Sequence, residues 1–190
     1  MSILQEVFEL HKLALNDVAR YPKRRFTYDP VINRTGKHFL GISGLRGVGK
    51  SVVLKQVASS TPESIYISVD TLGREDLFSI VKDLSVDYGI STFLLDEVHY
   101  CATVDEKLKK IYDFLDVSVV FTSSVALGMS KSAFDLSRRV RLIGMHPFSF
   151  REYVYFKDDK ILPRLSLRSI INREWSPDHL KYGYLFDPYM

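Results

Sequence analysis

The 190-residue sequence is poor in the features that mark secreted and membrane proteins. Its single cysteine, Cys101, excludes an intrachain disulfide and a multi-cysteine metal site, and it favours a reducing, cytoplasmic setting. Gln5, Glu6 and Glu9 interrupt the apolar run that an export signal would need. No apolar stretch approaches the roughly 18 residues of a membrane-spanning helix, so we expect no membrane as a partner. The histidines are scattered without the spacing of a zinc site.

An excess of one charge is also absent. The 26 Lys and Arg residues against 23 Asp and Glu residues give a net charge of +3. This excess is too small to imply nucleic acid or an anionic membrane by itself. The length accommodates one domain with a short appendage. With 46% hydrophobic residues, the chain can bury a core that folds without disulfides.

The apolar residues predict an amino-terminal helix followed by alternating strands and helices. Residues 2–20 carry apolar side chains at the spacing of an amphipathic helix. Because helices connect consecutive strands in the rest of the chain, we expect an α/β fold with a parallel sheet covered on both faces, and ligands at the carboxyl ends of its strands. We expect the strands at 38–43, 64–69, 91–96, 117–122 and 139–144, and the intervening helices at 50–59, 74–87, 104–114 and 125–136.

Three segments follow from this pattern. Residues 1–36 hold the amino-terminal helix and a basic linker, residues 37–155 hold the core, and residues 156–190 form a carboxyl-terminal appendage. The linker is either a solvated stretch or a contact for phosphate. Its basic residues are Arg20, Lys23, Arg24 and Arg25.

The strongest motif is G-L-R-G-V-G-K-S at residues 44–51, which fits G-x-x-x-x-G-K-[ST] between a strand and a helix. Glycines let the backbone N–H groups turn inward around a phosphate at the amino end of the helix. Lys50 adds a point charge for the β and γ phosphates, and Ser51 can give its hydroxyl to Mg²⁺. The pattern predicts a site for ATP or ADP with Mg²⁺. Its binding residues are Gly44, Leu45, Arg46, Gly47, Val48, Gly49, Lys50, Ser51 and Val52.

The third strand ends in two acidic residues. We interpret S-T-F-L-L-D-E-V as a Walker B sequence that delivers Asp96 and Glu97 to the ligand-binding edge of the sheet. Asp96 would hold the hydrated Mg²⁺, and Glu97 would orient and deprotonate the attacking water. The alternative is an acidic helix cap after a buried strand.

The fourth strand ends in hydroxyl groups at Thr122, Ser123 and Ser124. One of these side chains is expected to sense the γ-phosphate, although such residues are also common helix caps. Before the fifth strand, an arginine can reach the γ-phosphate of a neighbouring subunit, or it can cap the preceding helix. The candidates are Arg138, Arg139 and Arg141. For His99 and Cys101 a structural role is favoured over a catalytic dyad.

Three stretches together resemble a known family: residues 44–51, D-E-V-H at 96–99 and R-V-R-L-I-G-M-H-P-F-S-F-R-E-Y at 139–153. They resemble the AAA+ branch of P-loop ATPases, and within it the prokaryotic AAA ATPases that are often fused to a carboxyl-terminal domain of unknown function. The resemblance spans roughly residues 20–155. It implies a three-layer α/β/α fold with strand order 5-1-4-3-2, ATP with Mg²⁺, and a helical lid, which residues 156–190 would supply only in part.

The resemblance also implies roles and partners. Glu97, Lys50 and Arg139 are the expected catalytic residues, with Arg139 given in trans inside a homo-oligomer and Arg138 standing where the family usually has glycine. Full-length relatives continue beyond this length, so the chain is either truncated or a minimal member. The first functional hypothesis is Mg²⁺-dependent ATP hydrolysis coupled to conformational change or partner assembly, slow in the isolated chain. The second is a nucleotide-dependent switch or a DNA-associated loader, which the basic stretch around Arg24 favours.

Overall fold

The computed structural model describes residues 2–73, 75–124, 136–164 and 166–173. The chain divides into two compact units, Met1–Pro147 and Phe148–Met190. The expected amino-terminal segment therefore lies in the same unit as the sheet. The expected boundary at residue 155 stays a prediction. Within the described residues, no helix is long and apolar enough to cross a bilayer.

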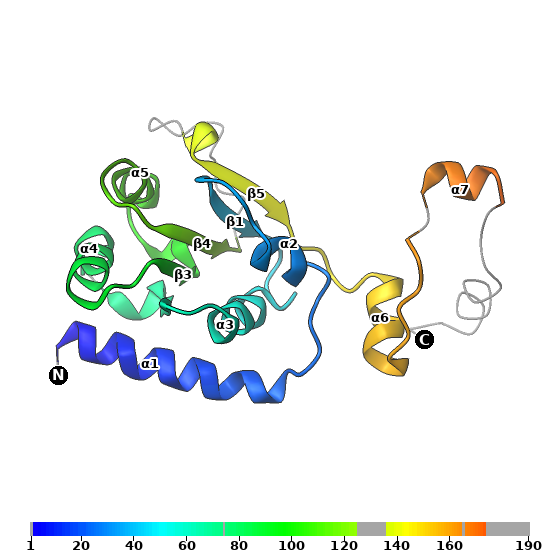
Figure 1. The fold of residues 1–190 in the computed structure, drawn as a ribbon, viewed down its shortest axis with the longest axis horizontal. Coiled ribbons are helices and arrows are strands. Elements are labelled where there is room, and N and C mark those ends of the chain that lie inside the picture. Colours follow the sequence, from blue (N-terminus) through cyan, green and yellow to red (C-terminus); the bar gives the residue numbers. More distant parts are fainter. Residues whose placement is uncertain (1, 74, 125–135, 165, 174–190) are drawn as a thin grey trace. The chain divides into compact units, whose positions relative to one another are not determined.

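The first unit is built on a five-stranded sheet in the order β2-β3-β4-β1-β5 (Figure 1). All four strand pairings are parallel. This order confirms the expected 5-1-4-3-2 arrangement, and each strand begins and ends within one residue of its expected bounds. The strands are β1 (Phe39–Ser43), β2 (Ser64–Ser68), β3 (Thr92–Asp96), β4 (Ser118–Ser123) and β5 (Val140–Gly144).

Helices precede and connect the strands of this unit, as the apolar pattern predicts. The expected helix at 74–87 begins only at Leu77, because the Asp76 side chain accepts a hydrogen bond from Ser79 N–H at 3.1 Å and caps it. The helix expected at 125–136 falls outside the described residues, apart from Leu136 in a short 3₁₀ turn. The α-helices are α1 (Ile3–Asp17), α2 (Tyr28–Ile32), α3 (Lys50–Ser60), α4 (Leu77–Tyr88) and α5 (Val104–Phe114).

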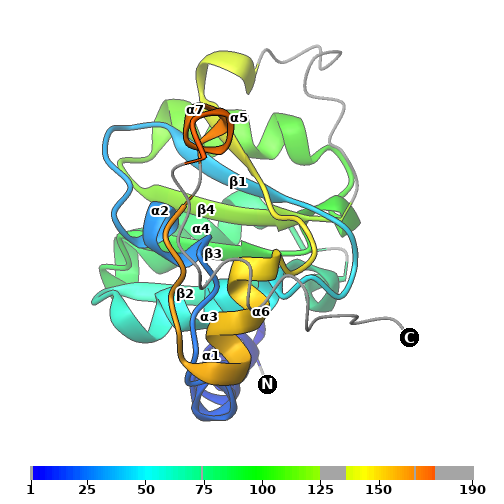
Figure 2. The same ribbon diagram turned by 90° about the vertical axis from the view of Figure 1, so that its right-hand side faces the viewer.

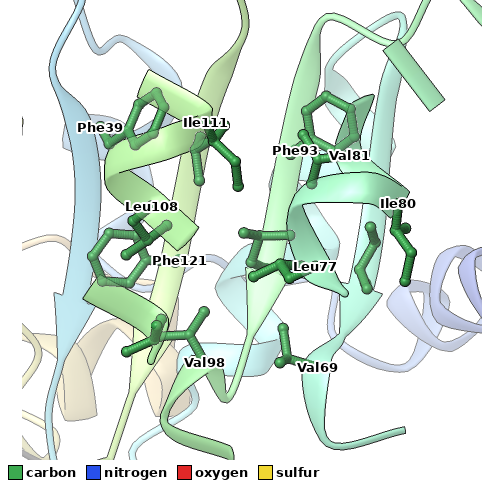
Figure 3. Close-up of a cluster of buried hydrophobic side chains, with 14 of the residues drawn as sticks. Phe39, Val69, Leu77, Ile80, Val81, Phe93, Val98, Leu108, Ile111 and Phe121 are labelled. Carbon is green, nitrogen blue, oxygen red and sulfur yellow. The ribbon is translucent and has the colours of Figure 1, made fainter. Parts of the chain in front are cut away.

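Two hydrophobic cores cover the two faces of the sheet. On one face, α4 and α5 pack against Phe39, Phe93 and Phe121 (Figure 3). On the other face, α3 packs against Leu40 and Leu94. Consecutive strand residues thus enter opposite cores, as alternation along a strand requires. The three-layer α/β/α arrangement follows from this alternation of large apolar side chains.

Helix α1 lies beyond β2 at one end of the sheet (Figure 2). An edge strand presents unpaired N–H and C=O groups, which need a cover. The His11 side chain supplies part of it, because Nδ1 accepts a hydrogen bond from Tyr66 N–H at 3.1 Å. Burial lowers the pKa of His11 and so favours the neutral ring that can accept this bond. The amino-terminal helix is therefore an edge cover of the sheet.

In the described part of the second unit, residues 148–164 and 166–173, the chain forms the short helices α6 (Phe150–Asp158) and α7 (Leu167–Ile171). Helix α6 begins with a capping box, in which Ser149 Oγ accepts from Glu152 N–H at 3.3 Å and the Glu152 carboxylate accepts from Ser149 N–H at 3.1 Å. Arg151, in the first turn of α6, donates from Nε to the Leu162 carbonyl at 2.8 Å and so holds the chain that follows the helix. Whether this unit serves as a partial lid stays a prediction.

Candidate nucleotide-binding site

The motif residues of the sequence meet at the carboxyl ends of β1, β3 and β4. A pocket of about 490 Å³ opens there, between the loop of residues 44–49 and the residues that follow β3. Lys50, Ser51, Asp70, Glu97 and Tyr100 are part of its lining. Larger cavities, of about 600 and 540 Å³, lie elsewhere in this unit, but neither contains the loop residues. The chemistry of the lining, rather than size, therefore selects the candidate site.

The loop conformation depends on three of its glycines. Gly47 and Gly49 have φ angles of +80° and +94°, in the region that other residues rarely adopt. A Cβ at Gly44 would stand 2.2 Å from the carbonyl oxygen of Met145, so only glycine allows the loop to approach the chain that follows β5. Helix α3 begins directly after Gly49, at Lys50. The loop thus leads into a helix amino terminus, the geometry that favours anions.

Lys50 spans the mouth of the loop. Its ammonium donates to the carbonyls of Gly44 and Leu45, both at 2.9 Å, and to Ser124 Oγ at 3.1 Å. Burial lowers the pKa of Lys50, while the charges of Glu97 and Asp96 act in the opposite direction. Its ammonium is thus held by neutral oxygen acceptors with the two carboxylates nearby.

The two adjacent carboxylates have different surroundings. Asp96 is buried, and both of its oxygens accept hydrogen bonds, one from Tyr66 OH at 2.7 Å and the other from Thr122 Oγ1. Glu97 lines the pocket, and its backbone has a φ of 55°, a left-handed conformation that costs about 1–3 kcal/mol in a residue with a side chain. The Thr122 hydroxyl accepts from Glu97 N–H at 2.9 Å and so holds this conformation. The Asp96 carboxylate is therefore fixed in the interior, whereas Glu97 lines the pocket.

The hydroxyls at the end of β4 face different partners. Thr122 and Ser123 are 0% and 1% exposed, and Thr122 is engaged with Asp96 and Glu97. Ser124 Oγ lies between the carboxylate of Glu97, at 3.3 and 3.4 Å from its oxygens, and the ammonium of Lys50. Of the three expected sensors, Ser124 is therefore the one that the structure places beside the charged groups of the pocket.

Tyr66 is a site residue that sequence reasoning missed. It lies on β2, the strand next to that of Asp96, and its hydroxyl donates a hydrogen bond to the Asp96 carboxylate. Burial and the charge of Asp96 raise the pKa of Tyr66, so the phenol keeps its proton at any ordinary pH. Nothing in S-I-Y-I-S distinguishes this tyrosine from a core residue. Only the register that pairs Ser68 with Asp96 could have pointed to it.

The residues after Glu97 shape one wall of the pocket. Arg46 Nη2 donates to Tyr100 OH at 2.7 Å, and the rings of His99 and Tyr100 lie 4.6 Å apart. His99 Nδ1 stands 3.3 Å from a Glu97 oxygen, yet the orientation does not form a hydrogen bond. Cys101 Sγ contacts the Ala102 carbonyl at 3.3 Å, and burial raises the pKa of the thiol. The structural role favoured for His99 and Cys101 over a catalytic dyad stays a prediction.

The candidate arginines lie at the other edge of the sheet. Arg139 precedes β5, and its carbonyl accepts from Phe39 N–H at 2.8 Å at the amino end of β1. Its guanidinium donates to both carboxylate oxygens of Asp113, at 2.8 and 3.2 Å. Arg138 and Arg141 are exposed. The structure therefore brings none of the three arginines to the phosphate loop of the same chain.

The proposed metal ligands suit Mg²⁺ in kind. Each oxygen of the Asp96 carboxylate retains accepting capacity beside its hydrogen bond, and Ser51 offers a hydroxyl in the first turn of α3. Across the described ranges, no group of three or more His, Cys, Asp or Glu residues could hold a metal by itself. Mg²⁺ is usually held by one or two carboxylates together with phosphates and water. The residues thus fit an ion that arrives with a nucleotide.

Comparison with known proteins shows the family. Residues 36–154, well over half of the chain, match the family model described as an AAA domain. The chain belongs to the AAA domain family. This confirms the resemblance to AAA+ P-loop ATPases that residues 44–51, 96–99 and 139–153 indicated. A fused carboxyl-terminal domain is not part of that match.

Three individual proteins are also similar to the chain. An uncharacterised protein of Methanocaldococcus jannaschii is 30% identical over 194 residues, covering 86% of this chain, and the chain spans 41% of that relative's length. Among solved structures, AMPPCP-bound DnaA from Aquifex aeolicus is similar with 14% identity and a TM-score of 0.52, covering 84% of this chain and 54% of that chain. PCH-2 of C. elegans matches with 18% identity and a TM-score of 0.43, covering 78% of this chain and 43% of that chain. The likeness to DnaA supports the fold, and family membership supports a nucleotide-binding, ATPase-like protein.

Proposed function

We propose that this AAA domain binds ATP or ADP with Mg²⁺ at residues 44–51 and hydrolyses ATP to ADP and phosphate. The observation that carries the proposal is the chain of contacts Lys50–Ser124–Glu97 at the mouth of the loop, 3.1 to 3.4 Å per step. A cation and a carboxylate thereby line the same pocket, and a hydroxyl lies between them. This is the set needed to bind a γ-phosphate and to activate a water beside it.

Each residue has a distinct part in the proposed reaction. The Lys50 ammonium exchanges its bonds to the Gly44 and Leu45 carbonyls for the β and γ phosphates. Glu97 orients the water and takes its proton as the oxygen bonds to the γ-phosphorus and the bond to the ADP oxygen breaks. Ser124 hydrogen-bonds the γ-phosphate and reports its presence to Glu97.

Ser51 and Asp96 would hold Mg²⁺, whose charge, when it is bound, offsets the charge developing on the phosphate oxygens. Tyr66 and Thr122 keep the Asp96 carboxylate in place while it does so. Because the carboxylate has hydrogen bonds on both oxygens, it needs no rearrangement when the ion arrives. We place this activity in the cytoplasm, in keeping with the single cysteine.

Turnover of the isolated chain should be slow. The arginines expected to act on a neighbour's γ-phosphate lie away from this chain's own loop, and such an arginine is worth about 10³ to 10⁵ in rate in related systems. We therefore propose that hydrolysis accompanies homo-oligomer assembly, and that it drives a conformational change in a protein or DNA partner. The alternative is a nucleotide switch or DNA-associated loader with little hydrolysis.

Phosphate release tests the proposal directly. With saturating MgATP, Glu97→Gln should lower hydrolysis by about a hundredfold or more while ATP binding, measured by calorimetry, is unchanged. Glu9→Gln removes an exposed carboxylate from α1 and is the matched control. Equal rates in wild type and Glu97→Gln at every protein concentration, with or without duplex DNA, would favour the switch. Loss of ATP binding in Glu97→Gln would show that the carboxylate serves the fold instead.

A further inference from the structure

Arg25 contacts the phosphate loop from its outer side. This linker residue is only 7% exposed, although its neighbour Arg24 is on the surface. Its Nη1 donates to the Val48 carbonyl at 2.5 Å, and its Nη2 donates to the His146 carbonyl at 2.9 Å. One guanidinium thus joins the middle of the loop to the chain that follows β5. Neither of the two interpretations of the basic linker, a solvated stretch or a direct phosphate contact, describes this position.

The backbone around Arg25 is itself anchored. Gln56, buried in α3, donates its amide to the carbonyls of Tyr21 and Lys23 at 2.7 and 3.1 Å. The Arg25 carbonyl accepts from Tyr28 N–H at 2.9 Å at the start of α2. The guanidinium therefore starts from a fixed point, because the helix that follows the phosphate loop holds the linker in place.

The bond to Val48 determines the direction of the next N–H group. The peptide unit between Val48 and Gly49 is planar and trans, so its C=O and N–H point in opposite directions. A carbonyl held toward Arg25 directs the Gly49 N–H away from Arg25, and Gly49 lines the pocket whereas Arg25 does not. Because glycines stand on both sides of Val48, this peptide could otherwise rotate at low steric cost. The outer contact therefore decides which group the loop offers to a phosphate.

We propose that Arg25 is a positioning residue of the phosphate site, which it serves by locking the Val48–Gly49 peptide with its N–H toward the ligand. A charged donor on the carbonyl also polarises the peptide, and this strengthens its N–H as a donor. The inference rests on the proposed function, since it assigns Arg25 to the same nucleotide site. The bond to His146 fixes the guanidinium at its second nitrogen, so that both ends of the fork are used.

Arg25→Met tests the proposal against Arg24→Met. Both variants remove one positive charge from the same linker, but Arg24 lies over the Tyr28 ring at 4.2 Å and reaches Ser60 Oγ at 3.4 Å, away from the loop. The ligands are MgATP and magnesium tripolyphosphate, which lacks the nucleoside. We expect Arg25→Met to weaken both ligands about tenfold or more, the value of a charged hydrogen bond, and Arg24→Met to weaken neither.

A second readout observes the peptide itself. Val48–Gly49 is the only Val-Gly pair in the sequence, so ¹³C′-valine and ¹⁵N-glycine labelling gives one amide–carbonyl correlation in an NMR spectrum. This signal should move in Arg25→Met and stay in place in Arg24→Met, without any nucleotide present. A role confined to overall stability would not move it selectively. Arg25→Lys keeps the charge but cannot fork to two carbonyls, so it should weaken tripolyphosphate by an intermediate factor.

The outcomes separate this inference from the proposed function. Wild-type protein that binds neither ligand overturns both. Wild-type binding with an unchanged Arg25→Met variant, or with equal losses in the two methionine variants, overturns only the inference. A loss for ATP without a loss for tripolyphosphate would place the effect at the nucleoside end and also overturns it. If thermal unfolding shows that Arg25→Met does not fold, Arg25→Lys decides, and wild-type affinity in that variant rejects the inference.

Discussion

The carboxyl ends and the amino ends of the parallel strands carry polar groups in opposite ways. We call these two sides of the sheet its carboxyl edge and its amino edge. At the carboxyl edge, Lys50 and Asp96 are buried at 4% and 2% exposure, and their polar atoms are engaged with neighbouring side chains and carbonyls. At the amino edge, Arg139 and Asp113 form one forked pair whose side chains are 22% and 30% exposed. The first edge is a connected internal network, and the second is a surface ion pair.

This difference indicates what each edge can serve. Buried polar groups must be hydrogen-bonded, so the carboxyl edge keeps a fixed geometry that suits a ligand of the chain itself. A partly exposed ion pair usually contributes about 0–1 kcal/mol, and more when it is bidentate as here, so we expect Arg139 to exchange Asp113 only for a stronger anion such as a phosphate. We therefore expect the carboxyl edge to act within the chain and the amino edge to act between chains.

The largest effect should come from Lys50→Ala at the carboxyl edge. The loop then loses the cation that faces the β and γ phosphates, and ATP binding should fall below detection by calorimetry. Lys82→Ala, on the exposed side of α4, is the control and should bind ATP normally. Unchanged affinity in Lys50→Ala would reject the site assignment.

At the amino edge, Arg139→Ala should leave ATP affinity unchanged and lower only the turnover that rises with protein concentration. The loss should be about 10³-fold or more under assembling conditions, because the arginine acts on a neighbour's phosphate. Steady-state phosphate release over a concentration series measures it, with Lys82→Ala on the exposed side of α4 as the control. Asp113→Asn, which weakens the ion pair, should keep or raise this turnover. Fast, concentration-independent hydrolysis that Arg139→Ala does not change would show that turnover at the carboxyl edge needs no arginine from the amino edge of a neighbouring chain.

Tyr66→Phe should have a moderate effect that is confined to the carboxyl edge. It removes one hydrogen bond from the Asp96 carboxylate, so the Mg²⁺ concentration for half-maximal phosphate release should rise by about tenfold. Tyr112→Phe changes a tyrosine near Arg139 and should leave the Mg²⁺ requirement unchanged. A similar shift in both variants would mean that loss of stability, rather than Asp96, is responsible.

The smallest effect concerns His11, which holds Tyr66 N–H from α1. Because the folded-state pKa of His11 is lowered, the unfolded chain binds more protons, and stability falls as the pH drops below the ordinary value of 6.5. His11→Gln keeps a neutral acceptor and should flatten the fall in unfolding free energy between about pH 7 and pH 5. Denaturant unfolding at several pH values measures this. Parallel pH profiles for the two proteins would assign the dependence to other groups.

Local sequence patterns were sufficient to predict most of the strands and helices of the fold. Short apolar runs placed the strands to within one residue, because a buried strand needs apolar side chains on both faces. The helix start at Leu77 was missed by three residues, since capping by Asp76 depends on one side-chain bond that periodicity does not report. The strand order came from the family resemblance, and the observed pairing confirms it.

The candidate site was predictable only as a set of motifs. Residues 44–51 form one unbroken stretch of sequence and residues 96–97 another. Spacing within each stretch is therefore enough to predict a phosphate loop and a carboxylate pair. The choice among Thr122, Ser123 and Ser124 was left open, because alternation along a strand sends neighbours to opposite sides and the end of the strand had to be known to one residue. The choice of the γ-phosphate sensor remains a prediction, as do the roles of Lys50, Glu97 and Arg139, which the variants above test.

The sequence by itself determined the family, the strand positions and the phosphate-binding motif, because these depend on residues that are close together along the chain. Only the tertiary structure decided that Tyr66 holds Asp96, that Arg25 holds Val48, and that Arg139 is paired with Asp113. Each of these contacts joins residues more than twenty positions apart, through strand register and through the path of a linker. Hydrogen bonds of this kind require directions and distances that only the packed chain supplies.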